Sequence, residues 1–238
     1  MKHFFSGRFY RRPWRRSVAA HWLITGIIGA LLITFYCGNK LSIFTGMLNG
    51  MIIASFAAAL FLLAGAFLIP PAGDGAAKIG FRKIRRKDLG LCLGALLLAL
   101  IGSALISGCW QMTLDFFHIP YEKEQTLLQL VRGSDTLSLL KILLLTAAAV
   151  PLVEELVFRR CLYELLLKLG APAAMTGGAM IFAAAHGFLA GLPGLFFIGL
   201  VFQALCNVTR NLWCSVICHA LLNATVVLLA FFFSPPSL

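Results

Sequence analysis

The sequence predicts an all-α membrane protein, a bundle of about seven transmembrane helices with a polar cavity inside the membrane. Two observations predict this class. Hydrophobic residues make up 60% of the 238 residues and charged residues only 12%, whereas soluble proteins average about 25% charged residues. Several apolar stretches also reach the ~20 residues that a helix needs to cross ~30 Å of hydrocarbon. No soluble core could bury all of them.

Hydrophobicity along the chain locates the expected helices. We expect spans at residues 18–36, 47–69, 89–109, 137–166, 172–190, 194–208 and 212–233. Composition then divides the chain into a basic N-terminus at 1–17, a first set of helices with an interfacial segment at 18–136, a second helical set at 137–233, and a tail at 234–238.

Basic residues predict the orientation of these helices. The 18–36 stretch is longer than the ~7–15 apolar residues of a signal peptide, so we interpret it as a retained anchor. Residues 1–17 and 78–87 are both rich in Lys and Arg, whereas the 39–46 loop has one lysine and residues 110–136 carry acidic groups. By the positive-inside rule, the N-terminus is expected to be cytoplasmic. The same alternation places four later basic residues on the inner side: Arg159, Arg160, Lys168 and Arg210.

The formal net charge of +11 does not indicate a nucleic-acid partner. The basic residues flank hydrophobic spans and form no single face interleaved with aromatic residues, so the lipid bilayer is the expected partner. The seven cysteines include no CxxC pair. We therefore expect them to act as small core hydrophobes.

Two adjacent carboxylates lie in the middle of an expected span. Of nine acidic residues, only Glu154, Glu155 and Glu164 follow residue 137. An ionisable side chain at the centre of a membrane helix costs at least ~2.5–3.5 kcal/mol, which makes these residues candidates for function. Pro151 lies just before them and removes a helical hydrogen bond, so we expect a kink that widens a cavity.

The helical spacing suggests different roles for the two carboxylates. Glu155 and Arg159 are four residues apart, which predicts an ion pair. Glu154 points about 100° away and has no partner nearby in the sequence, as expected of a general base or metal ligand. His186, His219 and Asn223 also lie in apolar surroundings, and the last two share a helical face. A single buried histidine is often structural, but together these residues indicate a site.

These residues occur in three ordered motifs. Glu154-Glu155-x-x-x-Arg159 is followed by Phe182-x-x-x-His186 and then by Trp213 with His219-x-x-x-Asn223. In this order they resemble the CPBP (Abi, CAAX protease and bacteriocin-processing) membrane proteases, relatives of type II CAAX prenyl endopeptidases. The resemblance covers roughly residues 137–225. It implies a protease of a bacterial inner membrane, with a catalytic cavity inside the bilayer.

The resemblance also implies roles for the site residues. Glu154, with His186, would activate a water for peptide-bond hydrolysis, while His219 and Asn223 would stabilise the oxyanion. Glu155, Arg159, Phe182 and Trp213 would support the site. The substrate would be a membrane-associated or lipidated protein or peptide.

Whether a metal takes part stays open at this point. Glu154, His186 and His219 are the ligands that a Zn²⁺ ion would use, but there is no HExxH motif. We expect a glutamic protease that needs no cofactor. Two other hypotheses also stay open: a non-catalytic family member acting as a bacteriocin-immunity or scaffold protein, and a small transporter, whose expected inverted repeats are not evident.

Overall fold

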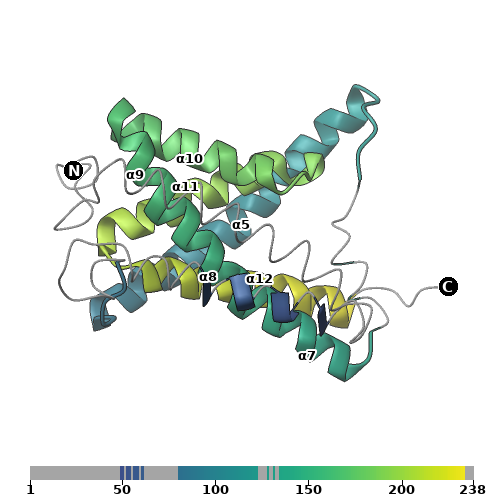
Figure 1. Cartoon of the computed structure of the whole chain (residues 1–238). Helices are drawn as coiled ribbons and strands as arrows, with labels where there is room; N and C mark the ends of the chain where they lie inside the picture. The colour runs from purple at the N-terminus through teal and green to yellow at the C-terminus, as the bar shows by residue number, and fades with distance from the viewer. Residues whose placement is uncertain are drawn as a thin grey trace.

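The computed structural model describes residues 80–122 and 134–233, together with short pieces between 49 and 61 and the single positions 128 and 131. Over these residues the chain forms helices and no strand, as predicted (Figure 1). The principal α-helices are α5 (Arg86–Phe116), α7 (Thr136–Leu144), α8 (Val150–Glu155), α9 (Tyr163–Leu166), α10 (Ala171–Ala185), α11 (Leu192–Thr209) and α12 (Leu212–Phe233).

One long helical stretch runs from Thr136 to Leu169. It begins at the N-cap Asp135, whose side chain accepts the Ser138 N–H at 2.6 Å. It ends at Gly170, which adopts a positive φ of 95° and so prevents the helix from continuing. Between these ends α7, α8 and α9 are joined and extended by shorter segments: the π-helical η2 (Leu145–Ala149) and η3 (Leu156–Leu162) and the 3₁₀ turn η4 (Leu167–Leu169).

Four helices in the described part of the chain are long and apolar enough to cross a membrane, and the protein is therefore a multi-pass membrane protein. They cover Arg86–Phe116, Thr136–Leu169, Leu189–Thr209 and Leu212–Phe233. The expected span at 18–36 lies outside the described residues, and the one at 47–69 lies largely outside them. The number of seven spans is therefore not confirmed.

The expected span at 172–190 is corrected by the structure. Helix α10 ends at Ala185, and its 15 residues are ~22 Å long, too short to cross ~30 Å of hydrocarbon unaided. The chain turns at His186 and at Gly187, whose φ is +60°. A short 3₁₀ turn, η5 (Leu189–Gly191), then leads directly into α11. Hydrophobicity alone did not show this turn because its neighbours are all apolar.

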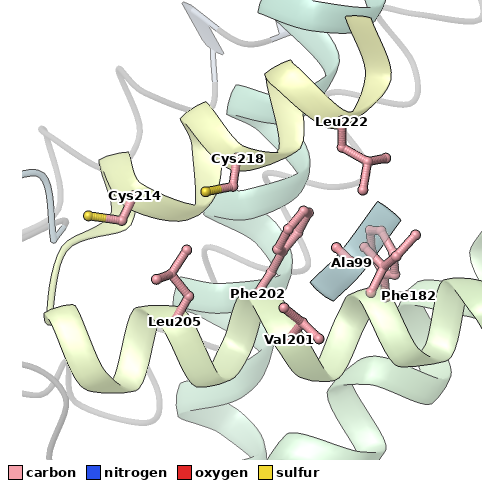
Figure 2. Packing of buried hydrophobic residues seen from close by; sticks show 9 residues of the cluster. Ala99, Phe182, Val201, Phe202, Leu205, Cys214, Cys218 and Leu222 are labelled. Carbon is pink, nitrogen blue, oxygen red and sulfur yellow. The ribbon is translucent and has the colours of Figure 1, made fainter. Parts of the chain in front are cut away.

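Helices α5, α10, α11 and α12 enclose a hydrophobic cluster. Figure 2 shows Phe202 pointing from α11 toward α12, where Cys218 and Leu222 lie. Cys161, Cys206, Cys214 and Cys218 are buried, which agrees with the expected role of the cysteines as small core residues. Cys109 is exposed, so the expectation is wrong for this residue. At the crossing of α5 and α11, a Cβ on Gly194 would come within 2.9 Å of the Ser103 carbonyl oxygen, so only glycine fits there.

The outer surface of this bundle is strongly apolar. In α5 most large hydrophobic side chains are exposed within the described part of the protein, including Leu93, Ile101 and Leu105. Helix α12 lies alongside α7 and α8 (Figure 1) and likewise presents exposed residues such as Leu229. This distribution suits a lipid environment, in which apolar side chains face outward.

Candidate active site

The two adjacent glutamates lie at the end of α8, between two π-helical segments. The Val150 N–H bonds to the Leu145 carbonyl, five residues back, which is the π-helical pattern. Pro151 has no N–H to donate. Single π-helical turns of this kind are rare and are often found at functional sites. The two π-helical segments set the directions in which the side chains of Glu154 and Glu155 point.

Glu155 is fully buried and is held from two sides. Its Oε2 lies 3.0 Å from Arg159 Nε, which is the predicted ion pair. Its Oε1 lies 2.9 Å from His219 Nδ1. Helical spacing could not predict this second contact, because Glu155 and His219 are 64 residues apart in the chain. The contact connects α8 to α12 through the centre of the bundle.

Glu154 faces the other nitrogen of the same histidine. Its Oε2 lies 3.8 Å from His219 Nε2, and its side chain keeps 24% of its surface exposed. The Oε2 atom itself is buried and has no hydrogen-bond partner among the described residues. A separation of 3.8 Å is too long for a direct hydrogen bond, but one water can bond to both atoms across it.

His219 therefore lies between two carboxylates. Its Nδ1 is 2.9 Å from Glu155 Oε1 and its Nε2 is 3.8 Å from Glu154 Oε2. The imidazole ring thus connects the two adjacent glutamates of α8 to α12.

His186 is at the C-terminal end of α10. Its Nδ1 lies 2.8 Å from the carbonyl oxygen of Phe182, and its ring contacts the Phe182 ring at 4.7 Å between centroids. The described contacts of His186 do not include Glu154. The structure thus brings Glu154 next to His219, whereas His186 lies against Phe182.

The ring of Phe182 contacts several residues of this site. The Arg159 guanidinium lies over its ring, 4.8 Å from the centroid, which is within the range of a cation–π contact. His219 packs against the same ring at 6.0 Å, and Phe158 meets it edge-on at 5.1 Å. Because Phe182 is 1% exposed, it fixes the positions of both histidines and of Arg159.

Asn223 lies one turn after His219 on α12. Its Nδ2 donates to the Thr146 carbonyl at 2.9 Å. That carbonyl needs a donor, because the Val150 N–H bonds to Leu145 and Pro151 has none. Asn223 therefore satisfies a carbonyl that the π-helical turn leaves free. The second N–H of its amide group is not used in this contact.

Trp213, in contrast, is not at the glutamates. It lies in the first turn of α12, is 40% exposed, and packs against Phe81 with ring centroids 4.6 Å apart. Trp213 therefore lies at the end of the bundle where α12 begins. A surface depression lies beside Trp213 and Phe81. A polar cavity at Glu154 stays a prediction.

The three expected metal ligands, Glu154, His186 and His219, do not converge on one point in the structure. Among the described residues, no group of three or more His, Cys, Asp and Glu side chains is arranged to hold a metal ion. Glu154 and His219 approach each other, but the third expected ligand, His186, is turned toward Phe182. In this conformation the three side chains do not form a ligand set.

Comparison with known proteins gives one match. Residues 136–225 match the family described as "Type II CAAX prenyl endopeptidase Rce1-like". The matched segment contains all three motifs with Glu154, His186 and His219. No curated protein and no solved structure matches the chain. The match is to proteases and does not favour the scaffold or transporter hypotheses. Residues 136–225 therefore match an Rce1-like domain, of the type II CAAX prenyl endopeptidase (CPBP) family of membrane proteases.

Proposed function

We propose that this protein is an intramembrane endopeptidase that hydrolyses a peptide bond in a membrane-associated or lipidated substrate. One observation supports the proposal above all others. A buried carboxylate oxygen of Glu154, without a hydrogen-bond partner in the described structure, faces His219 Nε2 at 3.8 Å inside a membrane-spanning bundle. Carboxylates buried in a membrane without a structural partner are functional candidates by default.

Glu154 acts as the general base in this mechanism. A water bound to its Oε2 gives up a proton to the carboxylate while the water oxygen attacks the carbonyl carbon of the substrate. The protonated Glu154 then donates that proton to the leaving amine nitrogen as the C–N bond breaks. His186 is the second residue that would bind this water. Catalytic hydrogen bonds often tighten only when substrate is bound, so its present contact with Phe182 is compatible with this role.

His219 and Asn223 stabilise the negative charge that develops on the carbonyl oxygen. A preorganised donor of this kind contributes ~2.7–4 kcal/mol to the transition state. Glu155 holds the Nδ1–H of His219 at 2.9 Å, so the Nε2 position faces Glu154 and the substrate. Arg159 holds Glu155 in place through a contact of 3.0 Å. In this mechanism Glu155 and Arg159 position His219 and do not touch the substrate.

We propose glutamate catalysis over a metal-dependent mechanism. In its support, Glu154 and His219 are arranged to share a water, whereas His186 does not complete a ligand set with them. The proposal needs no cofactor.

We also propose a bacterial inner-membrane location with the N-terminus in the cytoplasm. The basic 80–87 segment and the turn between α11 and α12 meet at one end of the bundle, where the Leu212 N–H bonds to the Gly80 carbonyl. Both carry basic residues and were expected on the same inner side. A reporter fused to the N-terminus that became active only outside the cytoplasm would contradict this orientation.

The function is tested with the purified full chain in detergent. Quenched-fluorescent peptides with and without a prenyl group are incubated with wild type, Glu154→Gln and His186→Ala, each with and without a chelator. Cleavage by wild type alone, insensitive to the chelator, is expected. Cleavage that the chelator abolishes and Zn²⁺ restores would overturn the glutamate mechanism. An active Glu154→Gln variant would overturn the assignment of the base.

A further inference from the structure

A group of basic residues precedes α5 and is not used by the proposed reaction. Between residues 80 and 90 there are five basic residues and one acidic residue. The acidic one, Asp88, is buried and bonded to Arg85 at 2.9 Å. Four basic side chains at this end of the bundle form no ion pair with a carboxylate of the described residues: Arg82, Lys83, Arg86 and Lys87.

The segment that carries Arg82 and Lys83 is held rigidly against α12. The Asn211 side chain bonds to both backbone groups of Arg82, accepting its N–H at 3.1 Å and donating to its carbonyl at 3.0 Å. The Arg85 guanidinium reaches the Thr209 carbonyl at 3.2 Å. Asn211 is 2% exposed. The backbone at Arg82, next to Lys83, is thus fixed by two partly buried hydrogen bonds.

This segment and α12 form an open depression of about 620 Å³. Two aromatic rings, Phe81 and Trp213, make contact at one side of it. The side chains of Arg82, Lys83 and Ile84 complete the lining. The depression therefore combines two cations with an apolar, aromatic wall. It is separate from Glu154 and His219, which lie deeper in the bundle.

The depression lies where helices enter the membrane. Two membrane-length helices, α5 and α12, begin here, and α11 ends here (Figure 1). Lys and Arg clusters next to a membrane helix attract anionic lipids, and Trp side chains concentrate at the level of the headgroups. Arginine matches the geometry of a phosphate group, and lysine supplies a compact charge beside it.

We propose that this depression binds the headgroup of an anionic phospholipid. Arg82 and Lys83 contact the phosphate, while Trp213 and Phe81 pack against the glycerol region and the first part of the acyl chains. The proposal is independent of the proposed protease function. It also gives Trp213 a role, which its distance from the glutamates leaves open.

The test measures lipid binding to the purified full chain. Native mass spectrometry titrates wild type with phosphatidylglycerol and with phosphatidylcholine of the same acyl chains. The variant is Arg82→Gln/Lys83→Gln. The matched control, Arg86→Gln/Lys87→Gln, removes the same charge outside the depression. Wild type is expected to prefer phosphatidylglycerol by about tenfold or more, since each interfacial cation contributes about a fivefold change. The first variant loses this preference and the control keeps most of it.

A second measurement covers the case in which the variant folds poorly. Brominated phosphatidylglycerol should quench Trp213 more than brominated phosphatidylcholine does, with the Trp213 signal taken as the difference between wild type and Trp213→Phe. Equal quenching by the two lipids, or equal loss of binding in both double variants, would overturn the proposal. Displacement of the lipid by inorganic phosphate alone would overturn it too, because it would identify a site for free phosphate.

Discussion

Two buried carboxylate–arginine pairs lie on the same helical stretch and differ in their surroundings. Glu155 and Arg159 form one pair, and Arg160 and Glu164 form the other at 2.8 Å. Both span four residues and both are almost fully buried. The first pair also reaches a catalytic candidate on another helix, because Glu155 bonds to His219. In the described structure, the hydrogen-bonding and ionic contacts of Glu164 are limited to Arg160.

The comparison shows that a buried ion pair does not by itself mark a site. Local helical geometry accounts for the Arg160–Glu164 pair, since residues four apart share a face. The Glu155 pair becomes part of a site because it orients a histidine whose other nitrogen faces a carboxylate without a partner. The following variants compare residues of the candidate site with residues of the same helical stretch outside it.

The largest contrast is expected between Glu154→Gln and Glu164→Gln. If Glu154 is the base, Glu154→Gln lowers the rate of peptide cleavage by about 10²–10⁴-fold with little change in the free energy of unfolding. Glu164→Gln removes the buried ion pair with Arg160, so it lowers stability and keeps the activity of the remaining folded protein. Cleavage rates and thermal unfolding in detergent measure both effects. Equal activity losses in the two variants would contradict the assignment of Glu154 as the base.

The next contrast separates the proposed catalytic role of Asn223 from its hydrogen bond to the Thr146 carbonyl. In Asn223→Ala, activity falls by about 10²–10³-fold through loss of an oxyanion donor. Stability falls by about 1–3 kcal/mol because the Thr146 carbonyl loses its donor. Adding Pro151→Ala supplies a new backbone N–H next to that carbonyl, so stability should recover in part and activity should not. Recovery of activity in the double variant would show that Asn223 acts only on the helix.

Replacing each whole pair by apolar residues sharpens the comparison further. Glu155→Leu/Arg159→Met and Arg160→Met/Glu164→Leu should both fold, because exchanging a complete buried pair for hydrophobic residues is often neutral. Glu155→Leu alone should cost about 3–5 kcal/mol by leaving Arg159 unpaired. Only the first double variant should lose activity, by about 10–100-fold, as for residues that orient metal-bound histidines. Equal activity in both double variants would contradict a positioning role for Glu155.

The smallest effect concerns an exposed carboxylate at the start of the same helix. Hydrogen bonding to the Ser138 N–H lowers the pKa of Asp135. A lowered pKa in the folded state means that this cap contributes stability above the usual Asp pKa, and the contribution is lost as the pH falls through the lowered value. Asp135→Asn should therefore show a weaker dependence of thermal unfolding on pH in acid, with nearly unchanged activity. An unchanged pH dependence would contradict this role.

The sequence by itself determined much of this protein. Its long apolar stretches specified membrane-spanning helices, because backbone N–H and C=O groups find no water in a bilayer and a helix satisfies them internally. The spacing of Glu155 and Arg159 specified their ion pair, because contacts four residues apart depend only on helical geometry. The order of three motifs identified the family, and the family match over residues 136–225 confirms it.

Only the tertiary structure decided how the candidate site is arranged. His219 lies between Glu154 and Glu155, Asn223 bonds to the Thr146 carbonyl, and Trp213 lies at the end of the bundle. These contacts join residues that are far apart in the chain, and helical periodicity carries no information about them. The packing of α12 against α8 and η2 selects them, because side chains on two helices meet only when the crossing of the helices is set.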